Sequence, residues 1–575
     1  MNNMIKDNTN TYRNSAEIIF EDGLDIHKKD IYDHISLEES ALLIKNKIYM
    51  HDSKFFDLTL NCCSISLNDV FKNGLIINGI KLEKPKNLFD IISQIIIFIS
   101  NLENEISGGL TLVNFDHELE NIINHLGLNQ PTQEDLFNCI KMFFQTINFS
   151  NSRYGHQSPY VSLSIGIVNN PNSAMICDTI LRVLYEGASF GKPYLFPNVH
   201  FRIKKGINKN CNDPFYKLYE RARKVTSHQM NPTYILADSE MNRNIDPLHL
   251  HVVGCRSRLL ETGKEEKYGI GRTNIGAISI NLPGVAMDTG GIESFIIELK
   301  NIMHHSANIL LKKAGVLKKK LFRNAPTLRD NNLLYPFDNN ISSIIDNASL
   351  AIGFIGGSEM CDVLSPNLTI GQKHDMINHI LKIMRDYCDE LSKKHNKIFT
   401  LIGVSGEGIS YHFPNNDKKS DRNSVYENIW GKGFYTNSFH VPVYELVNPI
   451  EKLSLEGKHQ NLCNGGSISY LEISHVKENI EGFADIIEIA ENNNISYLGF
   501  NFEKNFCNEC NLEIDADEKC PHCNSSNILK IRRVSGYLGY LNSFSEGKKI
   551  EEKNRIKHTK VNSKFAMISE AVCQR

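Results

Sequence analysis

Four cysteines in the C-terminal part of the chain have the spacing of a metal site. They form the pairs CNEC and CPHC, at Cys507, Cys510, Cys520 and Cys523, with nine residues between the pairs. Two such pairs present four thiolates in the tetrahedral arrangement that zinc prefers, and four protein ligands leave no open position for catalysis. An iron–sulfur cluster or two redox dithiols are the alternatives, and His522 could replace one cysteine. We predict a structural zinc site.

The charge pattern does not favour nucleic acid as a partner of this ribbon. Acidic residues outnumber the single lysine in the connecting segment NLEIDADEK, and an acidic surface repels phosphate. The whole chain has a net charge of -3, so no overall field would attract it to nucleic acid or to an anionic membrane. We therefore expect a small, locally bound substrate.

Three further cysteines could carry reactive chemistry. Cys255 lies in GCRS, and a tight polar loop between Gly254 and Arg256 displays a reactive thiol better than a helix interior does. Cys62 and Cys63 are adjacent, so their side chains point in different directions and only one is expected to face a given site. Buried packing is the role we expect for the remaining cysteines, which are Cys139, Cys177, Cys211, Cys361, Cys388, Cys463 and Cys573.

The stretch IRRVSGYLGYLNSF, residues 531–544, places Gly536 in a run otherwise suited to a strand and a tight turn. A turn explains most glycines, because glycine reaches positive φ without steric cost. These residues on their own leave the role of Gly536 open.

The elements that would position these groups alternate along the chain. Apolar residues recur at helical spacing in 294–315, and Gly315 is expected to end that helix. Strand-like apolar runs lie between the helical segments, as LIINGIKL, YVSLSIGIV, GAISINL, FTLIGVSG and SISYLEI. This alternation predicts an α/β architecture with reactive residues in loops at the strand ends.

The chain has 575 residues, of which 41% are hydrophobic, enough to bury a large core. Near residue 500 the sequence becomes polar and cysteine-rich. We therefore expect a main α/β body over 1–500, a zinc ribbon over 501–530 and a C-terminal segment with Gly536 over 531–575.

No segment predicts a membrane span or an exported protein. The most apolar window, 88–100, is interrupted by Asp90 and Gln94 and is typical of a buried helix. The N-terminus is polar and has no apolar signal core. We expect a soluble, cytoplasmic protein whose fourteen cysteines are thiols or metal ligands, not a disulfide framework.

Several motifs with unrelated chemistry together resemble one enzyme family. They are NCCSISLNDVFKNG, GCRS followed by GRTNIGAISINLPG, FYTNSFHVPV with GGSISYLE, and RRVSGYLG after the two CxxC pairs. In order and approximate spacing they resemble the anaerobic (class III) ribonucleoside-triphosphate reductases, large catalytic subunit. The similarity runs from about residue 45 to the end of the sequence.

The resemblance implies a ten-stranded α/β barrel with a central finger loop, followed by a zinc ribbon and a glycyl radical segment. It places the radical at Gly536 in RVSGY, in preference to Gly539. Loss of a Cα hydrogen from glycine leaves an electron shared between the flanking amide nitrogen and carbonyl, with no side chain to prevent planarity. The family commonly has cysteine at Ser535, a difference that leaves the Cα chemistry unchanged. Cys255 at the finger-loop tip resembles the thiol that becomes a thiyl radical and removes the 3′ hydrogen of the ribose.

Cys62 resembles the second thiol, which delivers a hydrogen as the 2′ hydroxyl leaves as water. Cys63 is the less favoured choice, because the family motif has its cysteine directly after an asparagine, here Asn61. Asn274 matches the asparagine beside the ribose hydroxyls in the formate-using branch, which implies formate as co-substrate and reductant. Cys573 near the C-terminus keeps a redoxin open as the alternative reductant.

Triphosphate binding is expected in GVSGEGIS, at Ser405, Gly406 and Glu407, where small residues let backbone N–H groups approach phosphate. A plain turn is the alternative. The family usually has a Thr-Pro-Ala-Glu-like sequence here, from which this chain departs. The segment YTNSFHV, residues 435–441, is a family marker expected to line the same pocket.

The resemblance also implies partners. No CxxxCxxC motif is present, so the radical would be installed by a separate radical S-adenosylmethionine activase with a [4Fe–4S] cluster. We expect a homodimer that responds to ATP and deoxynucleoside triphosphate effectors, with helices between about 85 and 150 at the interface. Because the body motifs begin near residue 45, we expect no N-terminal ATP-cone and no dATP inhibition through one.

Two rival functions remain open from the sequence. A glycyl radical enzyme of the formate acetyltransferase type shares RVSGY and has adjacent cysteines, but in that family the pair lies in a mid-chain finger loop, whereas Cys62 and Cys63 lie near the N-terminus. The zinc ribbon and GCRS also oppose it. A zinc-ribbon binding protein is the non-enzyme alternative, and oxygen-sensitive radical formation at Gly536 would exclude it.

Overall fold

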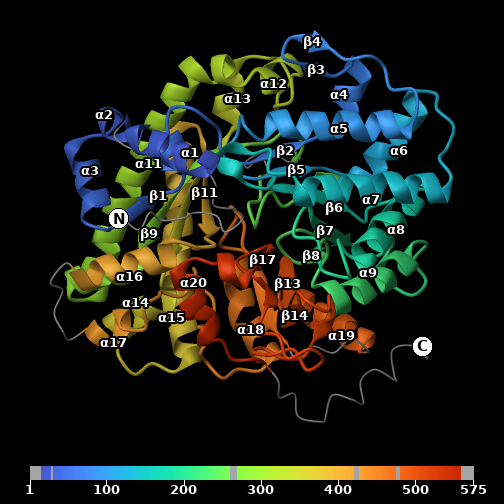
Figure 1. The fold of residues 1–575 in the computed structure, drawn as a ribbon. Coiled ribbons are helices and arrows are strands. Elements are labelled where there is room, and N and C mark those ends of the chain that lie inside the picture. The colour runs from blue at the N-terminus through green and yellow to red at the C-terminus, as the bar shows by residue number, and fades with distance from the viewer. Residues whose placement is uncertain (1–14, 28–29, 260–267, 420–425, 474–478, 559–575) are drawn as a thin grey trace.

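The computed structural model describes residues 15–27, 30–259, 268–419, 426–473 and 479–558. Helices surround a central set of strands, and the C-terminal elements lie against that body (Figure 1). The N-terminal helices are α1 (Ser15–His27), α2 (Asp30–His34) and α3 (Leu37–Ile44).

The first half of the strand set is a parallel run of five strands. Their order is β2, β5, β6, β7 and β8, and each pairs in parallel with the next. The strands are β2 (Cys63–Ile65), β5 (Leu110–Leu112), β6 (Val161–Ile165), β7 (Asn198–Ile203) and β8 (Thr233–Leu236). The helices between them are α4 (Asn68–Asn73), α5 (Leu88–Leu102), α6 (Phe115–His125), α7 (Gln133–Phe149), α8 (Pro171–Glu186) and α9 (Tyr216–Gln229).

The second half also contains five strands. Strands β9, β10 and β11 are parallel neighbours, β12 and β13 are a second parallel pair, and β13 runs antiparallel to β8. These strands are β9 (Asn274–Asn281), β10 (Ser349–Ile355), β11 (Ile398–Gly403), β12 (Ser469–Glu472) and β13 (Tyr497–Asn501), and β1 (Ile48–Met50) pairs with β9 from outside.

Two isolated bridges join the halves into a closed ring of ten strands. Cys63 of β2 pairs with Thr273 just before β9, and Ile402 of β11 pairs with Gly466 just before β12. Closure of this kind leaves no free edges and buries both faces of the strands, because helices cover the outside. All residues of β10 are accordingly buried. The predicted α/β barrel is confirmed.

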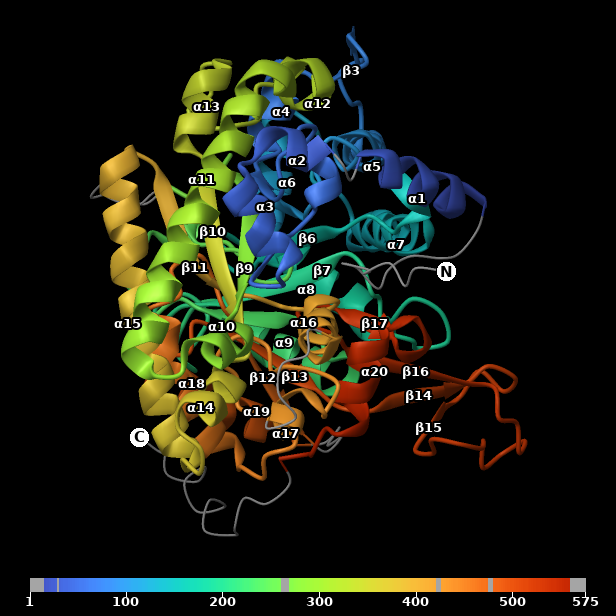
Figure 2. The ribbon, with the colours of Figure 1, turned by 90° about the vertical axis from the view of Figure 1, so that its left-hand side faces the viewer.

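Long helices cover the outer face of the second half. Helix α11 (Ile292–Asn324) packs on β9 and β10, and α15 (Ile370–His395) packs on β11 (Figure 2).

The expectation that Gly315 ends the helix is wrong, because α11 continues through it for nine more residues. Leu317 and Leu321 are buried, and this packing outweighs the glycine penalty of roughly 1 kcal/mol in a helix interior. The other helices of this half are α10 (Leu282–Thr289), α12 (Pro326–Asp330), α13 (Ile341–Asn347), α14 (Gly357–Leu364), α16 (Ile409–Lys419), α17 (Glu427–Trp430), α18 (Pro449–Gln460) and α19 (Ile480–Asn492).

Four of the five predicted strand runs belong to the ring, as parts of β6, β9, β11 and β12. The fifth, LIINGIKL, forms the separate hairpin β3 (Ile76–Ile77) and β4 (Ile80–Lys81). The apolar window 88–100 forms α5 as predicted, although Phe89 and Ile97 on its outer face are exposed.

Between β8 and β9, residues 252–258 lie inside the barrel, in contact with β5 and with the segment before β12. This loop turns back at residues 253–257, where Val253 and Ser257 form a bridge around Cys255. The hydroxyl of Thr111 on β5 donates a hydrogen bond to the carbonyl of Val252 at 3.0 Å, which attaches the loop to the barrel wall. This is the finger loop that the resemblance implied.

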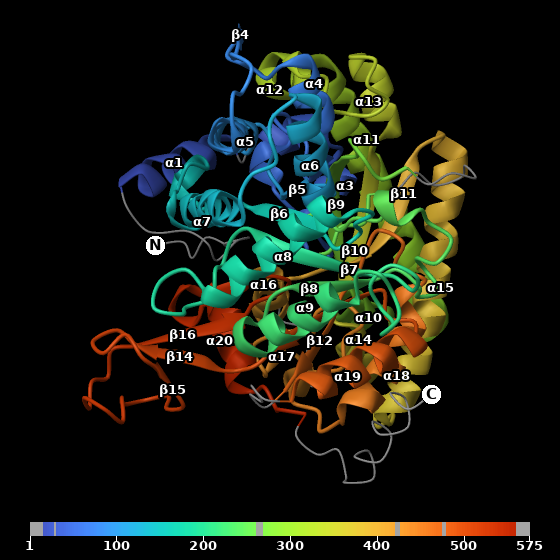
Figure 3. The same cartoon turned by 90° about the vertical axis from the view of Figure 1, so that its right-hand side faces the viewer.

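The C-terminal part forms a small four-stranded sheet in the order β15, β14, β16, β17. Its strands are β14 (Lys504–Cys507), β15 (Glu513–Ile514), β16 (Ile528–Arg533) and β17 (Leu538–Tyr540), and α20 (Glu546–Lys553) follows. The end with β14 and β15 projects from the body, while β17 and α20 return to it (Figure 2, Figure 3). Since β16 crosses residue 530, the ribbon and the Gly536 segment share one sheet.

Within the described ranges, no helix combines the length and the apolar character that a membrane crossing requires.

The finger loop touches the wall so closely that Gly109 has no room for a side chain. A Cβ added there would lie 2.6 Å from the Cα of Gly254, and backbone cannot move aside as a flexible side chain does. We expect Gly109→Ala to destabilise the protein by about 1–3 kcal/mol and to lower the thermal unfolding midpoint. The matched control is Gly315→Ala in α11, where nothing lies within 4 Å and alanine should stabilise by about 0.5–1 kcal/mol. Equal midpoints for the two variants would contradict this.

Candidate active site

Gly536 and Cys255 are in direct contact inside the barrel. Gly536 lies in the turn between β16 and β17, which the N–H of Val534 closes by donating to the carbonyl of Tyr537 at 3.0 Å. A Cβ added to Gly536 would lie 2.6 Å from the Cβ and 2.7 Å from the carbonyl oxygen of Cys255. Gly536 has no positive φ, so the turn itself does not demand glycine. Glycine is needed because any side chain at this position would overlap Cys255.

Two buried arginines hold the peptide groups on either side of the Gly536 Cα. Arg256, next to Cys255 on the finger loop, donates to the carbonyl of Ser535 and, at 2.8 Å, to the hydroxyl of Tyr470. Arg533 donates to the carbonyl of Gly536 at 3.0 Å. Hydrogen bonds from a buried guanidinium are strong, so the orientation of this turn relative to Cys255 is well determined.

The thiol of Cys62 lies on the wall next to the finger loop. Its Sγ accepts a hydrogen bond from the N–H of Gly109 at 3.3 Å and donates to Oδ1 of Asn61 at 3.2 Å. Burial raises the pKa of Cys62 to about 12, and the neighbouring Cys255 thiol adds to this shift. Cys62 is therefore a protonated thiol near neutral pH, suited to give a hydrogen atom and unsuited to act as a thiolate nucleophile.

Cys63 faces the other way. Its Sγ donates to Oγ1 of Thr273 at 3.3 Å, and the side chain is fully buried in the main core. The structure thus brings Cys62 to Cys255 and keeps Cys63 apart. Asn274 is fixed in the same place, because its Oδ1 accepts a hydrogen bond from the N–H of Cys62 at 2.7 Å.

The loop after β11 meets the same centre. The hydroxyl of Ser405 lies 3.1 Å from the Sγ of Cys255. The carboxylate of Glu407 accepts hydrogen bonds from Ser535 at 2.7 Å and Tyr537 at 3.0 Å. A Cβ on Gly406 would meet Ile355 at 2.7 Å. These side chains therefore face the cysteine and the glycine turn, and phosphate binding by this loop stays a prediction.

Aromatic and basic side chains that no sequence motif singled out enclose the centre. Tyr160 on the β6 side packs against Tyr537 with ring centroids 5.3 Å apart, and its ring lies 3.5 Å from where a Cβ of Gly254 would be. Arg256 is part of GCRS, and its charge beside a thiol is the signal that could have indicated its role. Tyr160 and Tyr470 carry no local pattern, because only closure of the barrel brings them together.

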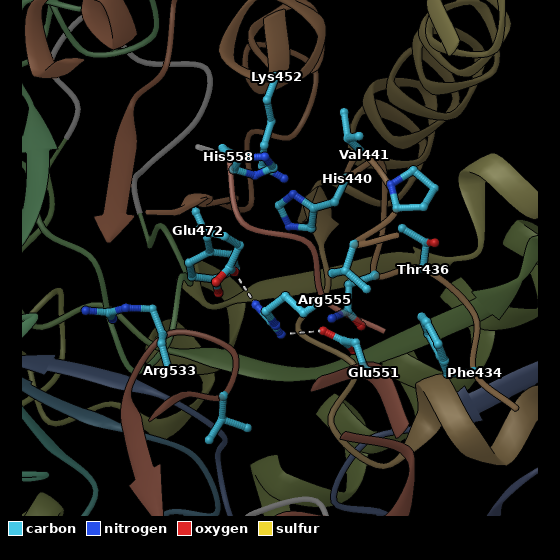
Figure 4. Close-up of a pocket in the computed structure, with 15 residues that line it drawn as sticks. Phe434, Thr436, His440, Val441, Lys452, Glu472, Arg533, Glu551, Arg555 and His558 are labelled. Atoms are coloured by element: carbon cyan, nitrogen blue, oxygen red, sulfur yellow. Dashed lines mark hydrogen bonds and ion pairs between the residues drawn. The ribbon is translucent and has the colours of Figure 1, made fainter. Parts of the chain in front are cut away.

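A small cavity lies behind the Gly536 turn. Its volume is about 40 Å³, too small for a nucleotide. Figure 4 shows Arg555 between Glu472 and Glu551, to which it is ion-paired. The cavity is lined by Phe434, Thr436, Asn437, His440, Val441, Pro442, Val443, Lys452, Tyr470, Glu472, Arg533, Val534, Glu551, Arg555 and His558. Residues of the family marker 435–441 thus line the same cavity as Glu551, Arg555 and His558 of the C-terminal segment.

The four ribbon cysteines come together as predicted. Their sulfur atoms all lie within 4.8 Å of one another, with Cys507 and Cys523 3.6 Å apart and Cys510 and Cys520 4.0 Å apart. Four zinc–sulfur bonds of about 2.3 Å in a tetrahedron place the sulfurs at such separations. The N–H of His522 donates to the Sγ of Cys520 at 3.4 Å, as in a zinc knuckle, and the imidazole is not part of the group. The predicted grouping of the four cysteines is confirmed, and zinc binding by it stays a prediction. Cys573 lies outside the described residues.

The fold and its centre define a class: an α/β barrel in which a finger-loop cysteine meets a C-terminal glycine, with a second cysteine beside them. The model of the family "Anaerobic ribonucleoside-triphosphate reductase" matches residues 7–558. The chain belongs to this family of oxidoreductases for deoxyribonucleotide synthesis, as the resemblance indicated. The formate acetyltransferase type and the zinc-ribbon binding protein are set aside.

Individual relatives agree with the family assignment. The chain is 28% identical over 559 residues to the anaerobic ribonucleoside-triphosphate reductase of Haemophilus influenzae, which covers 89% of this chain and 78% of that enzyme. It is 27% identical over 557 residues to the corresponding enzyme of Enterobacteria phage T4, with 89% and 90% covered. The structure of the anaerobic ribonucleotide reductase from Thermotoga maritima in complex with dATP and CTP has the same fold, with a TM-score of 0.72, 16% identity and coverage of 94% and 90%.

The raised pKa of Cys62 predicts low reactivity. Near pH 8 a pKa of about 12 leaves about a thousandfold less thiolate than an unperturbed cysteine has. We expect iodoacetamide to label Cys62 slowly in the folded protein and at an ordinary rate in urea, measured by peptide mass spectrometry. Cys211 is the internal control, because it is exposed and the expectation that it is buried is wrong. Because burial favours the neutral thiol, its contribution to the free energy of unfolding is fully present below pH 8. This contribution is lost as the pH rises from about 8.5 toward 12. Equal labelling of Cys62 and Cys211 would show that Cys62 is not buried as described.

The ribbon predicts one zinc ion per chain. We expect Cys520→Ser to remove the metal, because three thiolates bind zinc far less tightly than four, and to loosen β16, which leads to Gly536. Metal analysis of anaerobically purified protein checks this, with Cys211→Ser as the control that keeps its zinc. Iron in place of zinc, or unchanged metal in the Cys520 variant, would refute the assignment.

Proposed function

We propose that this chain reduces ribonucleoside triphosphates to 2′-deoxyribonucleoside triphosphates by glycyl and thiyl radical chemistry, with formate as the reductant. The contact between Gly536 and Cys255 supports this most strongly, because it leaves no atoms between the Cα that would hold the radical and the residue that would receive it. Membership of the reductase family gives the substrate class.

In the proposed first step the radical at Gly536 takes the hydrogen atom of the Cys255 thiol. The Cα–H bond of Gly536 forms again and a thiyl radical remains on Cys255. This transfer needs contact and a fixed turn, which the Arg256 and Arg533 hydrogen bonds supply.

The Cys255 thiyl then removes the 3′ hydrogen of the ribose, and the 2′ hydroxyl leaves as water. Cys62, protonated because of its raised pKa, supplies a hydrogen to the 2′ carbon, and formate restores the lost hydrogen and electron as it is oxidised to carbon dioxide. Cys255 finally returns the 3′ hydrogen. The sum is ribonucleoside triphosphate, formate and a proton giving deoxyribonucleoside triphosphate, carbon dioxide and water. Asn274 is proposed to hold Cys62 in place and to face the ribose hydroxyls.

Formation of the radical requires a partner. We propose a separate radical S-adenosylmethionine activase with a [4Fe–4S] cluster. Gly536 is buried in the barrel, so the turn between β16 and β17 must leave its position for an activase to reach the Cα. The ribbon projects from the body and is proposed to carry structural zinc (Figure 3). We propose that it is the rigid base from which the turn moves.

Effector control is proposed at a homodimer interface on α5 and α7. The outer face of α5 exposes Phe89 and Ile97, and Phe149 at the end of α7 is also exposed. A relative was solved in complex with dATP and CTP, which supports nucleotide effectors and substrates for this family fold. For the substrate triphosphate, the main chain of residues 405–407 before α16 remains the proposed cradle.

Anaerobic conversion of CTP to dCTP tests this function. After treatment with a cognate activase, we expect dCTP only in the presence of formate, and none with Gly536→Ala or Cys255→Ser. Cys62→Ser should lower turnover by at least about a thousandfold, because serine cannot give up a hydrogen atom, while CTP binding persists. A Cys63→Ser variant is the control and should keep most of the activity. A radical without dCTP under formate or any redoxin would overturn the proposal.

A further inference from the structure

The loop between β11 and α16 contacts both residues of the proposed radical pair. Ser405 lies 3.1 Å from the Cys255 sulfur, and two residues later Glu407 binds the turn that holds Gly536. Gly406 between them is packed against Ile355 and Ile409. One short, well-packed loop therefore fixes the thiol and the glycine turn relative to each other.

We propose that Glu407 is a positioning residue that clamps the Gly536 turn against Cys255, an inference that rests on the proposed function for its catalytic consequence. One carboxylate oxygen accepts from the hydroxyl of Ser535, the residue before Gly536, at 2.7 Å. The other accepts from the hydroxyl of Tyr537, the residue after it, at 3.0 Å. Rotation or withdrawal of the turn breaks both bonds at once.

Burial makes these bonds strong. Glu407 is 7% exposed, Ser535 1% and Tyr537 2%. Hydrogen bonds to an ionised carboxylate away from water exceed ordinary ones in strength, and a buried carboxylate left without donors is costly. The clamp therefore adds to the free energy needed to open the turn.

The aromatic surroundings aim the Tyr537 hydroxyl at the carboxylate. The ring of Tyr537 packs against Tyr160 and Phe196, with ring centroids 5.3 Å and 5.5 Å away. The clamp also reaches α20, because the hydroxyl of its N-cap residue Ser545 donates to the carbonyl of Glu407 at 3.0 Å. Glu407 thus joins the barrel to the start of α20 as well as to the turn.

The clamp can be measured in the resting protein by hydrogen–deuterium exchange of peptides covering 531–545. Glu407→Gln loses the charge and places an N–H₂ donor where one of the two accepting oxygens was, so one hydroxyl can no longer donate there, and we expect exchange about tenfold faster or more. Tyr537→Phe should give a smaller increase, and adding it to Glu407→Gln should give less than the sum of the two effects, because both changes break one shared bond. Glu118→Gln is the control: this buried carboxyl group on α6 also accepts two hydrogen bonds, from Ser66 and Leu67, and its change should leave exchange over 531–545 as in wild type.

Activated enzyme supplies the second measurement. We expect Glu407→Gln to lower dCTP turnover per glycyl radical at least about tenfold while the KM for CTP changes less than about twofold, since the clamp acts on the radical pair and not on the substrate. A rise in KM with unchanged turnover would instead assign Glu407 to triphosphate binding and overturn the clamp. Unchanged exchange over 531–545 would also overturn it.

The two proposals fail separately. If wild-type protein forms no radical yet Glu407→Gln opens the turn, the proposed function fails and the clamp stands as a structural contact without its catalytic role. If wild type forms the radical and makes dCTP but the variant matches it in exchange and turnover, the clamp fails and the reductase function stands.

Discussion

The centre of this protein depends on the absence of a side chain at residue 536. With a Cβ there, the turn between β16 and β17 would overlap Cys255 by an amount that no rotamer change relieves, because the atoms it meets include main chain. The finger loop has the same requirement on its other side, where Gly109 and Gly254 let two backbones touch. Glycines on three separate segments thus allow the thiol to lie between the barrel wall and the C-terminal segment.

Hydrogen bonds then hold the Gly536 turn in the position beside Cys255 that the glycines make possible. Arg256 and Arg533 bind the carbonyl groups of Ser535 and Gly536, and Glu407 binds the side chains of Ser535 and Tyr537. Charged groups are tolerated here because each is hydrogen-bonded to peptide or hydroxyl partners as well as being buried. The turn at Gly536 is therefore held to the finger loop and to the loop after β11 by buried hydrogen bonds from charged side chains.

Local sequence patterns predicted what depends on local spacing. The two CxxC pairs predicted the four-cysteine cluster, short apolar runs predicted β6, β9, β11 and β12, and the family resemblance of the ordered motifs predicted the barrel with its finger loop. The prediction that the helix ends at Gly315 was wrong, because packing along its whole length stabilises α11 more than the helix propensities of its residues do. The partners of Glu407 could not be read from the sequence, since they lie 128 and 130 residues away and meet it only after the barrel closes.

The central prediction is that the radical forms at Gly536, and the site at which oxygen cleaves the backbone can test it. Oxygen cleaves a glycyl radical together with the backbone at that residue, so mass spectrometry of the activated protein after brief exposure to air measures the radical's location directly. The proposed function predicts a truncated chain that ends at the Ser535–Gly536 junction, formed in proportion to the radical present before exposure, and absent in Gly536→Ala. Cleavage at Gly539, or an intact chain from protein that carried a full radical signal, would contradict the account.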